Sequence, residues 1–367
     1  MNLVSILRFY FFCAAALFCS NTHGLAHVVE LVQDKKNFVD VVVIGGGPAG
    51  LSAASCVARE KKHVVVLMGP AEYRGGQLMA SSSVDNMPGF DPQPGYEIME
   101  KMERQTREWR AWLVEDEAVD VQVDTSGMLF TVTTKRGLVL HALAVIVATG
   151  STARKLEIPG AQTYDNNGIY TCAVCETLKA EGTHTAVVGG GDGALDAVMH
   201  LHSSARRMTV IVRKEHMRAS HSLQNKIKEF AHVDVLYNRE PVRFEGDGNK
   251  LTTLVVRDIL TNYEESLPIE CVFLAIGHVP HSELVKHLVN LDTQGYIILD
   301  GRSQRTSHKG IFAAGDVTDS VYRQASAASG DGGKSGLDAL SYLHEQTYLT
   351  AQDLKTLEPY YFKPAVD

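Results

Sequence analysis

Cysteine is scarce in this chain, and cationic residues are outnumbered by acidic ones. The 367 residues include 6 cysteines, 35 Lys and Arg and 43 Asp and Glu, for a formal net charge of -8. A small secreted scaffold held by disulfides would carry more cysteines at regular spacing. A nucleic-acid-binding protein would carry a basic stripe. The composition therefore argues against both classes.

The apolar run over residues 9–19 is too short to cross a membrane comfortably. One arginine precedes it and polar residues follow, a pattern typical of a signal peptide. We expect residues 1–26 to direct the chain to the secretory pathway (ER lumen or secreted), with cleavage after Gly24 or Ala26. A mitochondrial presequence and an uncleaved anchor are the alternatives. No stable membrane span is expected after processing.

The length of the chain exceeds that of one typical domain. Its content of 45% hydrophobic and 21% charged residues is ordinary for a globular protein. We therefore expect two domains, or one domain interrupted by another.

A strand, a glycine turn and a helix are predicted to follow one another in residues 38–60. The stretch FVDVVVIGGGPAGLSAASCVARE contains a valine-rich run, then Gly45-x-Gly47-x-x-Gly50, then an Ala-rich run. This order predicts a dinucleotide site, where the glycines permit a tight turn, approach of a pyrophosphate and close packing of helix on strand. The unpaired N–H groups of the helix N-terminus would face the phosphates. The next strand ends at Met68, where many such sites place an acid.

A second copy of this pattern lies in residues 184–212. A valine-bearing strand leads into Gly189-x-Gly191-x-x-Ala194 and a helix, and a further strand, MTVIV, follows. Two such units predict an α/β protein with two Rossmann-like dinucleotide-binding domains. Two dinucleotide sites in one chain favour one bound flavin and one diffusible nicotinamide nucleotide.

Three cations follow the second strand of this unit. Arg213 and Lys214 stand at its end, and Arg218 lies a helical turn further on. Cations at this position pair with a ribose 2'-phosphate, whereas an acid would repel it. The preferred nucleotide is therefore NADPH, and a solvated loop is the alternative interpretation of the cluster.

Cys172 and Cys175 form a Cys-x-x-Cys pair just before the second glycine turn. Zinc would need a second ligand pair at finger-like spacing, which the sequence lacks, so we expect no metal. A structural disulfide over so short a loop would add little stability. Redox exchange is the favoured use. Cys56 and Cys271 lie in apolar segments and are expected to be buried, unreactive thiols.

Residues 38–343 resemble a low-molecular-weight, bacterial-type thioredoxin reductase, a class II pyridine nucleotide-disulfide oxidoreductase. TCAVCE is similar to the redox-active box of that family, and YRGGQLM followed by VDNMPGF is similar to its flavin-contacting loop. VIVATGS resembles its Ala-Thr-Gly crossover, and GIFAAGDVTDSVYRQASAASGDG its terminal flavin segment. These elements occur in the order and spacing of the family, and together they are specific.

The resemblance implies an NADPH-dependent thioredoxin-disulfide reductase with FAD as its bound cofactor. Its FAD-binding domain would be discontinuous, over 38–152 and 279–347. An inserted NADPH-binding domain, 153–278, would carry the redox cysteines, and residues 348–367 would be a C-terminal tail. The resemblance also implies a homodimer, with thioredoxin or a thioredoxin-like protein as the partner.

The site residues combine those of the two glycine turns and the cation cluster with others that the resemblance implies. Catalysis would use Cys172, Cys175 and Glu176, with Cys175 facing the flavin and Cys172 attacking the partner disulfide. The FAD-binding residues would be Gly45, Gly47, Pro48, Ala49, Gly50, Gly76, Gln77, Leu78, Asn86, Ala148, Thr149, Gly150, Gly315, Asp316, Arg323, Gln324 and Ala325. The NADPH-binding residues would be Gly189, Gly191, Asp192, Ala194, Arg213, Lys214, Arg218 and Gly277.

Two positions depart from the family pattern. Glu176 replaces the usual Asp, which lengthens the reach of the acid that would protonate the thiolate. Lys334, within GDGGKSGLDAL, stands where the family helix has small or apolar residues.

Two alternative functions share most of these features. A flavin-dependent dithiol oxidase that passes electrons to oxygen would suit an oxidising lumen, but it has no need of the cations after the second turn. A non-catalytic, redox-sensing flavin module is the other alternative.

In the reductase, the flavin must meet the disulfide in one state and the nicotinamide in another. We therefore predict that the inserted domain rotates about two crossing strands, near residues 151–158 and 277–281.

Overall fold

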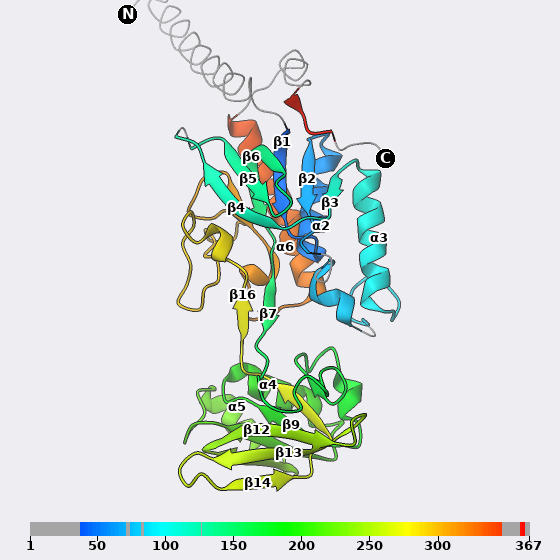
Figure 1. The fold of residues 1–367 in the computed structure, drawn as a ribbon, viewed down its shortest axis with the longest axis vertical. Coiled ribbons are helices and arrows are strands. Elements are labelled where there is room, and N and C mark those ends of the chain that lie inside the picture. Colours follow the sequence, from blue (N-terminus) through cyan, green and yellow to red (C-terminus); the bar gives the residue numbers. More distant parts are fainter. Residues whose placement is uncertain (1–36, 71–73, 82–83, 126, 347–359, 364–367) are drawn as a thin grey trace, which may run out of the picture. The chain divides into compact units, whose positions relative to one another are not determined.

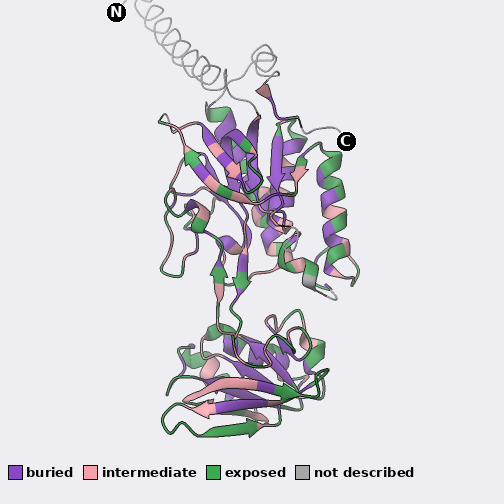
Figure 2. Cartoon of the chain, viewed as in Figure 1, coloured by how far each residue is buried: buried purple, intermediate pink, exposed green. Residues whose placement is uncertain are grey.

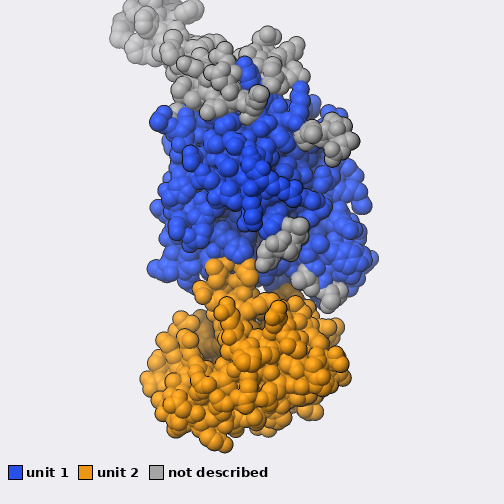
Figure 3. Space-filling view, viewed as in Figure 1, with its two compact units in different colours: residues 1–151, 280–367 blue, residues 152–279 orange. Residues whose placement is uncertain are grey.

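The computed structural model describes residues 37–70, 74–81, 84–125, 127–346 and 360–363. The chain divides into two compact units, which Figure 3 shows in two colours. Unit 1 comprises Met1–Ser151 and Pro280–Asp367, and unit 2 comprises Thr152–Val279. The expected targeting peptide, residues 1–26, lies outside the described residues.

Unit 1 is built on a seven-stranded sheet in the order β3-β2-β1-β6-β5-β4, with β17 paired to the last three residues of β6 (Figure 1). Strands β1, β2, β3, β6 and β17 are parallel to one another. Strand β5 is antiparallel to both of its neighbours, β6 and β4. The strands are β1 (Phe38–Ile44), β2 (Val64–Leu67), β3 (Trp112–Val114), β4 (Ala118–Val123), β5 (Phe130–Thr134), β6 (Val139–Val147) and β17 (Ile311–Ala313).

The helices of unit 1 bury one face of this sheet, and the segment after η4 covers part of the other. Val41 and Val43 of β1 pack into the helix-side core, and Val39 and Val42 pack into the opposite core together with Val285. Because both faces are covered, every residue of β1 is buried, and all of them except Asp40 are apolar (Figure 2). The helical elements are α2 (Pro48–Arg59), η2 (Gly76–Ala80), α3 (Gly95–Glu108), η4 (Glu283–Val285), η5 (Gly315–Val317) and α6 (Ala325–Gln346).

Unit 2 contains a five-stranded parallel sheet in the order β11-β10-β9-β15-β8. One face packs on helix α4, which contributes Leu195 and Val198 to the core. A three-stranded antiparallel sheet, β12-β13-β14, covers the other face through Leu254 and Val256. The elements are β8 (Ile169–Tyr170), η3 (Thr177–Ala180), β9 (His184–Val188), α4 (Asp192–Leu201), β10 (Arg207–Val212), α5 (His221–Ile227), β11 (Val233–Tyr237), β12 (Arg239–Gly246), β13 (Leu251–Asp258), β14 (Glu264–Leu267) and β15 (Cys271–Leu274).

Two short strands form the connection between the units. β7 (Ser151–Ala153) and β16 (His278–Pro280) pair in a two-stranded sheet. On one side of this pair the Arg154 N–H donates to the Gly277 carbonyl (2.9 Å), and on the other the His281 N–H donates to the Gly150 carbonyl (2.9 Å). The chain therefore passes between the units only through this pair of strands.

Part of the expected C-terminal tail is packed into unit 1. Tyr361 bridges Phe38 of β1, and the Phe362 N–H donates to the Phe38 carbonyl (2.9 Å). Tyr361 and Phe362 are buried, and the Tyr361 ring stacks on His63 with 3.7 Å between ring centroids. The aromatic side chains of these two residues complete the core beside β1.

Candidate functional site

The first glycine turn leaves the N-terminus of α2 open. A Cβ on Gly45, whose φ is 117°, would lie 2.2 Å from the Ala148 carbonyl oxygen, and one on Gly50 would lie 1.8 Å from the Gly45 carbonyl oxygen. Gly47 is the N-cap of α2 and makes no side-chain cap, and the first turn of the helix holds no acid. The free N–H groups and the missing side chains fit the pyrophosphate of a bound dinucleotide.

The other expected FAD-binding residues converge on the same edge of the sheet. The carboxyl ends of β1, β6 and β17 lie together because these strands are parallel neighbours. A Cβ on Gly315 would lie 2.9 Å from the Ala49 Cβ, and one on Gly76 would lie 3.8 Å from the Gly47 Cα. Ala148, Thr149 and Gly150 follow β6, Gly315 and Asp316 follow β17, Leu78 lies in η2, Pro48 begins α2, and Ala325 begins α6.

Hydrogen bonds fix the polar residues of this set. The Gln77 amide donates to the Ser151 carbonyl, and the Asn86 amide donates to Gln324 Oε1 at 3.0 Å. The Arg323 N–H donates to Asp319 Oδ2 (3.1 Å) and has a left-handed φ of 46°. These contacts order the loop that leads into α6.

Asp316 is an acid in an unfavourable place for a charge. Burial, with smaller contributions from the charges of Asp319 and Asp331, raises the pKa of Asp316 to about 6, although Arg323 opposes the shift. A carboxylate whose charge is poorly solvated benefits from hydroxyl donors. The ribityl chain of a flavin supplies such donors, so this residue also fits FAD.

The second glycine turn, in unit 2, repeats the geometry of the first. A Cβ on Gly189 (φ 147°) would lie 2.4 Å from the Ala275 carbonyl oxygen and 3.0 Å from the Ala194 Cβ. Gly191 is the N-cap of α4 without a side-chain cap, and no atom lies within 4 Å of where its Cβ would be. An open cradle therefore faces the N-terminus of α4, as the pyrophosphate of NADPH requires.

The three expected phosphate-binding cations are exposed on unit 2. Arg213 and Lys214 directly follow β10, and Arg218 follows in the same loop. Among the described residues none of the three takes part in an ion pair. Their charges are thus free to meet a ribose 2'-phosphate.

The cysteine pair is disulfide-bonded and lies in the same unit. The loop between β8 and η3 carries Cys172 and Cys175, and Cys175 is exposed. The Cys175 N–H donates to Cys172 Sγ at 3.2 Å, a contact that a thiolate accepts better than a thiol does. Among the described residues no group of His, Cys, Asp and Glu is arranged to hold a metal.

Glu176 follows the redox cysteines and is half-buried. Burial raises the pKa of its carboxyl, and the nearby Lys179 opposes the shift. A raised pKa keeps the acid form present at higher pH, which a proton donor needs. Cys271 is buried as expected, and burial raises the pKa of its thiol to about 12, which disfavours the reactive thiolate. Cys56 is only partly buried, yet burial raises the pKa of its thiol too.

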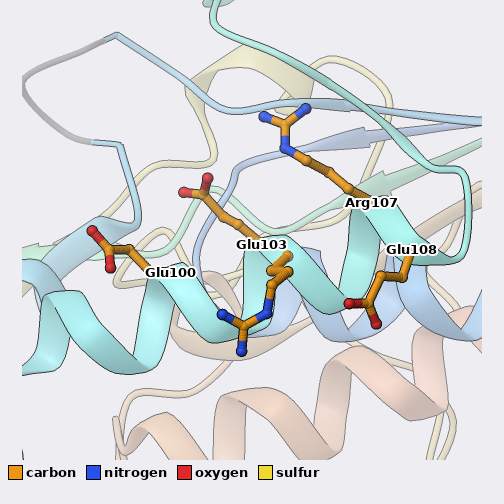
Figure 4. A pocket seen from close by; sticks show the side chains of 5 residues that line it. Glu100, Glu103, Arg107 and Glu108 are labelled. Atoms are coloured by element: carbon orange, nitrogen blue, oxygen red, sulfur yellow. The ribbon is translucent and has the colours of Figure 1, made fainter.

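A cavity of about 480 Å³ lies along α3 in unit 1. Its lining residues are Glu100, Glu103, Arg104, Arg107 and Glu108, and Figure 4 shows the four labelled side chains projecting from this one helix. Glu103 is already paired with Arg74. The cavity contains none of the expected cofactor-binding residues and has no part in the site.

The chain matches the pyridine nucleotide-disulphide oxidoreductase family over residues 39–332. It is 40% identical to a thioredoxin reductase of Mycolicibacterium smegmatis, covering 84% of this chain and 97% of that one, and 38% identical to one of Streptomyces coelicolor, covering 83% and 94%. A solved thioredoxin reductase of Giardia duodenalis superposes with a TM-score of 0.76 at 31% identity, covering 84% of this chain and all of that one. The chain belongs to the thioredoxin reductases.

This membership confirms the expected fold class of two dinucleotide-binding domains and the expected cofactors, FAD and NADPH. No helix among the described residues is long and apolar enough to span a membrane.

The structure also shows what Lys334 meets. Its Nζ lies 2.8 Å from Asp331 Oδ1, one turn earlier in α6. Ser335 is buried, and its hydroxyl donates to the Gly332 carbonyl (2.8 Å). Lys334 and Ser335 therefore both find their partners within α6. In this thioredoxin reductase the lysine offsets the charge of Asp331.

Proposed function

We propose that this chain transfers electrons from NADPH through FAD to the Cys172–Cys175 disulfide and then to thioredoxin or a thioredoxin-like protein. The observation that carries the proposal is the combination, within unit 2, of an open glycine cradle, three unpaired cations and an accessible disulfide. The cations distinguish it from an oxygen-dependent dithiol oxidase, which would not need NADPH.

The cysteines carry the last steps. The chemistry that bound FAD supplies is transfer of the two electrons of an NADPH hydride to the disulfide. The Cys172 thiolate then attacks one partner sulfur, the partner S–S bond breaks, and the departing thiolate takes up a proton. Attack of the Cys175 thiolate on Cys172 Sγ restores the disulfide and releases the second partner thiol. One NADPH and one proton thus yield NADP+ and two thiols.

The hydrogen bond between the cysteines supports this division of roles. The Cys175 N–H that donates to Cys172 Sγ favours the anionic form of that sulfur after reduction. Glu176 directly follows in the chain and is proposed to hold the proton for the departing thiolate.

The proposal is tested by anaerobic NADPH titration of the FAD-loaded enzyme. NADPH should bleach the flavin absorbance, and oxidised thioredoxin should restore it with two new thiols per NADPH. Cys172→Ser and Cys175→Ser should each still allow bleaching but abolish thiol formation. Turnover retained in either variant, or NADPH consumed with peroxide instead of thiols, would contradict the proposed path.

A rotation of unit 2 is proposed to alternate the two electron transfers. Support comes from the two-strand connection, β7 with β16, whose ends are anchored by the Arg154–Gly277 and His281–Gly150 hydrogen bonds. Only the residues between these anchors are left to pivot. Solution X-ray scattering of the enzyme with and without NADP+ should give different curves, and identical curves would count against the rotation.

Two further proposals concern the whole chain. One is that residues 1–26 direct it to the secretory pathway, with a mitochondrial location as the alternative. The other is that it forms a homodimer, supported by its membership of the thioredoxin reductases. Light scattering of the purified enzyme should give twice the mass of one chain, and a monomeric mass would refute the dimer.

A further inference from the structure

The segment that carries Arg218 is anchored in the core of unit 2 on alternate residues. Met217 and Ala219 are buried, at 6% and 5% exposure, and both pack with Val212 in the core beneath α4. Arg218 and Ser220, between and after them, are exposed. The alternation turns the Arg218 side chain outward while its neighbours hold the backbone.

Backbone hydrogen bonds join this segment to the second glycine turn. The Arg218 N–H (2.7 Å) and the Ala219 N–H (3.1 Å) both donate to the Gly190 carbonyl. A Cβ on Gly190 would lie 2.9 Å from Val212 Cγ1, so any larger residue here would displace the Val212 side chain. The cation is thus attached to the turn that would receive the pyrophosphate.

A side chain makes the third connection. Asp192, the first residue of α4, accepts the Ser220 N–H through Oδ1 at 2.8 Å. Ser220 is in turn the N-cap of α5, and its hydroxyl accepts the Leu223 N–H (3.5 Å). One carboxylate therefore ties the first turn of α4 to the N-cap of α5.

The carboxylate of Asp192 is poorly suited to direct contact with the pyrophosphate. The N-terminus of α4 should bind a pyrophosphate, which a nearby negative charge would repel. The contact with Ser220 gives the carboxylate a different task. We propose that Asp192 is a positioning residue for NADPH selectivity, which holds residues 218–220 against the glycine turn so that Arg218 reaches the ribose 2'-phosphate. This inference rests on the proposed function, and it replaces direct nucleotide contact as the role of Asp192.

The test compares two substitutions of Asp192 in the FAD-loaded enzyme. Binding of NADP+ and NAD+ is measured by calorimetry, because the two nucleotides differ only in the 2'-phosphate. Asp192→Ala removes the acceptor, so NADP+ affinity should fall roughly 10-fold or more while NAD+ affinity changes much less. Asp192→Asn keeps an oxygen acceptor and should retain most of the NADP+ preference. Asp196→Ala, which removes an exposed carboxylate one turn later in α4, is the matched control.

A double substitution identifies the route of the effect. If Asp192 acts through Arg218, then Asp192→Ala should cost little more NADP+ affinity in an Arg218→Ala background. Additive losses, an equal loss for NADP+ and NAD+, or loss of preference in Asp192→Asn would each overturn the inference. Thermal unfolding of each variant checks that unit 2 remains folded. Failure of the wild type to prefer NADP+ would instead overturn the proposed NADPH function.

Discussion

At the scale of single residues, Asp316 is a buried acid whose charge lowers the stability of the FAD-free protein. Its pKa, raised to about 6 chiefly by burial, exceeds the ordinary value of 3.8. A raised carboxyl pKa contributes stability that is complete below the unfolded pKa and is lost as the pH rises through the folded pKa. The FAD-free protein should therefore lose stability between about pH 4 and pH 6.

Asp316→Asn should remove this pH-dependent loss. At pH 7 the FAD-free variant should be more stable than the FAD-free wild type by up to about 3 kcal/mol, from two pKa units at about 1.4 each. The difference should shrink as the pH falls toward 4, and FAD affinity should be lower in the variant. Urea unfolding from pH 4 to pH 8 measures the first effect, and flavin fluorescence the second. Equal stabilities at pH 8 would show that the buried charge is not costly.

Glu176 is the second residue whose burial affects its proposed reaction, the protonation of the departing thiolate. Its raised pKa, due to burial and opposed by Lys179, extends its acid form to higher pH. If it protonates the departing thiolate, thioredoxin turnover should decline as the pH rises through that pKa. Glu176→Gln should lower the rate, by roughly 10²- to 10⁴-fold for lost acid catalysis, and flatten this decline. The measurement is the rate at saturating substrates from pH 5 to pH 9.

Glu181→Gln provides the control for this prediction. Glu181 is an exposed carboxylate in the same stretch, just after η3. Its substitution should leave both the rate and the pH profile unchanged. A Glu176→Gln enzyme with the wild-type profile would make Glu176 a bystander.

At the scale of secondary-structure elements, the contact between α2 and α6 supports the flavin side of unit 1. A Cβ on Gly332 of α6 would lie 2.1 Å from the Ala49 carbonyl oxygen, a backbone atom that cannot rotate aside. Gly332→Ala should therefore push α6 away from the first turn of α2, destabilise the protein by about 1–3 kcal/mol and weaken FAD retention.

Gly330→Ala is the matched control in the same helix. No atom lies within 4 Å of a Cβ at Gly330, and the residue is exposed. Alanine there should stabilise the helix by about 0.5–1 kcal/mol. Thermal unfolding and the flavin content of the purified variants distinguish the two substitutions. Equal melting temperatures would mean that the close approach at Gly332 is not important.

The elements that could be predicted from the sequence are those encoded locally. Each glycine turn spans few residues between a valine-rich strand and an Ala-rich helix, so Gly45 and Gly189 indicate both nucleotide folds. Ala194, which replaces a third glycine, is accommodated because Gly189 has no side chain: a Cβ on Gly189 would lie 3.0 Å from the Ala194 Cβ. The contact of Asp192 with Ser220 could not be predicted, since it depends on where the loop after β10 returns.

Packing between segments that lie far apart in the sequence could not be predicted from sequence patterns either. The three-stranded sheet β12-β13-β14 alternates irregularly, with register shifts near Pro241 and Gly246, and gave no distinct signal. The return of Tyr361 to β1 involves an aromatic residue near the end of the chain whose partners, Phe38 and Asp40, lie far away in sequence. Only the folded structure joins such segments.

At the scale of the whole molecule, the start of β1 and the FAD-binding glycine turn lie at opposite ends of the parallel strands of unit 1. The chain enters β1 at Phe38, beside Tyr361, whereas the glycine turn follows Ile44 at the carboxyl end. The first 36 residues therefore connect to the protein far from Gly45. A peptide removed from this end takes no residue from the described site.

The last prediction concerns processing. If residues 1–26 are a signal peptide, N-terminal sequencing of the mature protein should begin after Gly24 or Ala26, and the protein should fractionate with the secretory pathway. The chain without residues 1–26 should bind FAD and oxidise NADPH as the full chain does, because the site lies at the other end of β1. A luminal reductase would need a local supply of NADPH, since luminal glutathione is poised more oxidising than the cytosolic pool. An intact Met1 in a cytosolic fraction would refute the targeting proposal. A processed mitochondrial form would instead place the enzyme where NADPH-driven reduction of thioredoxin is the simpler expectation.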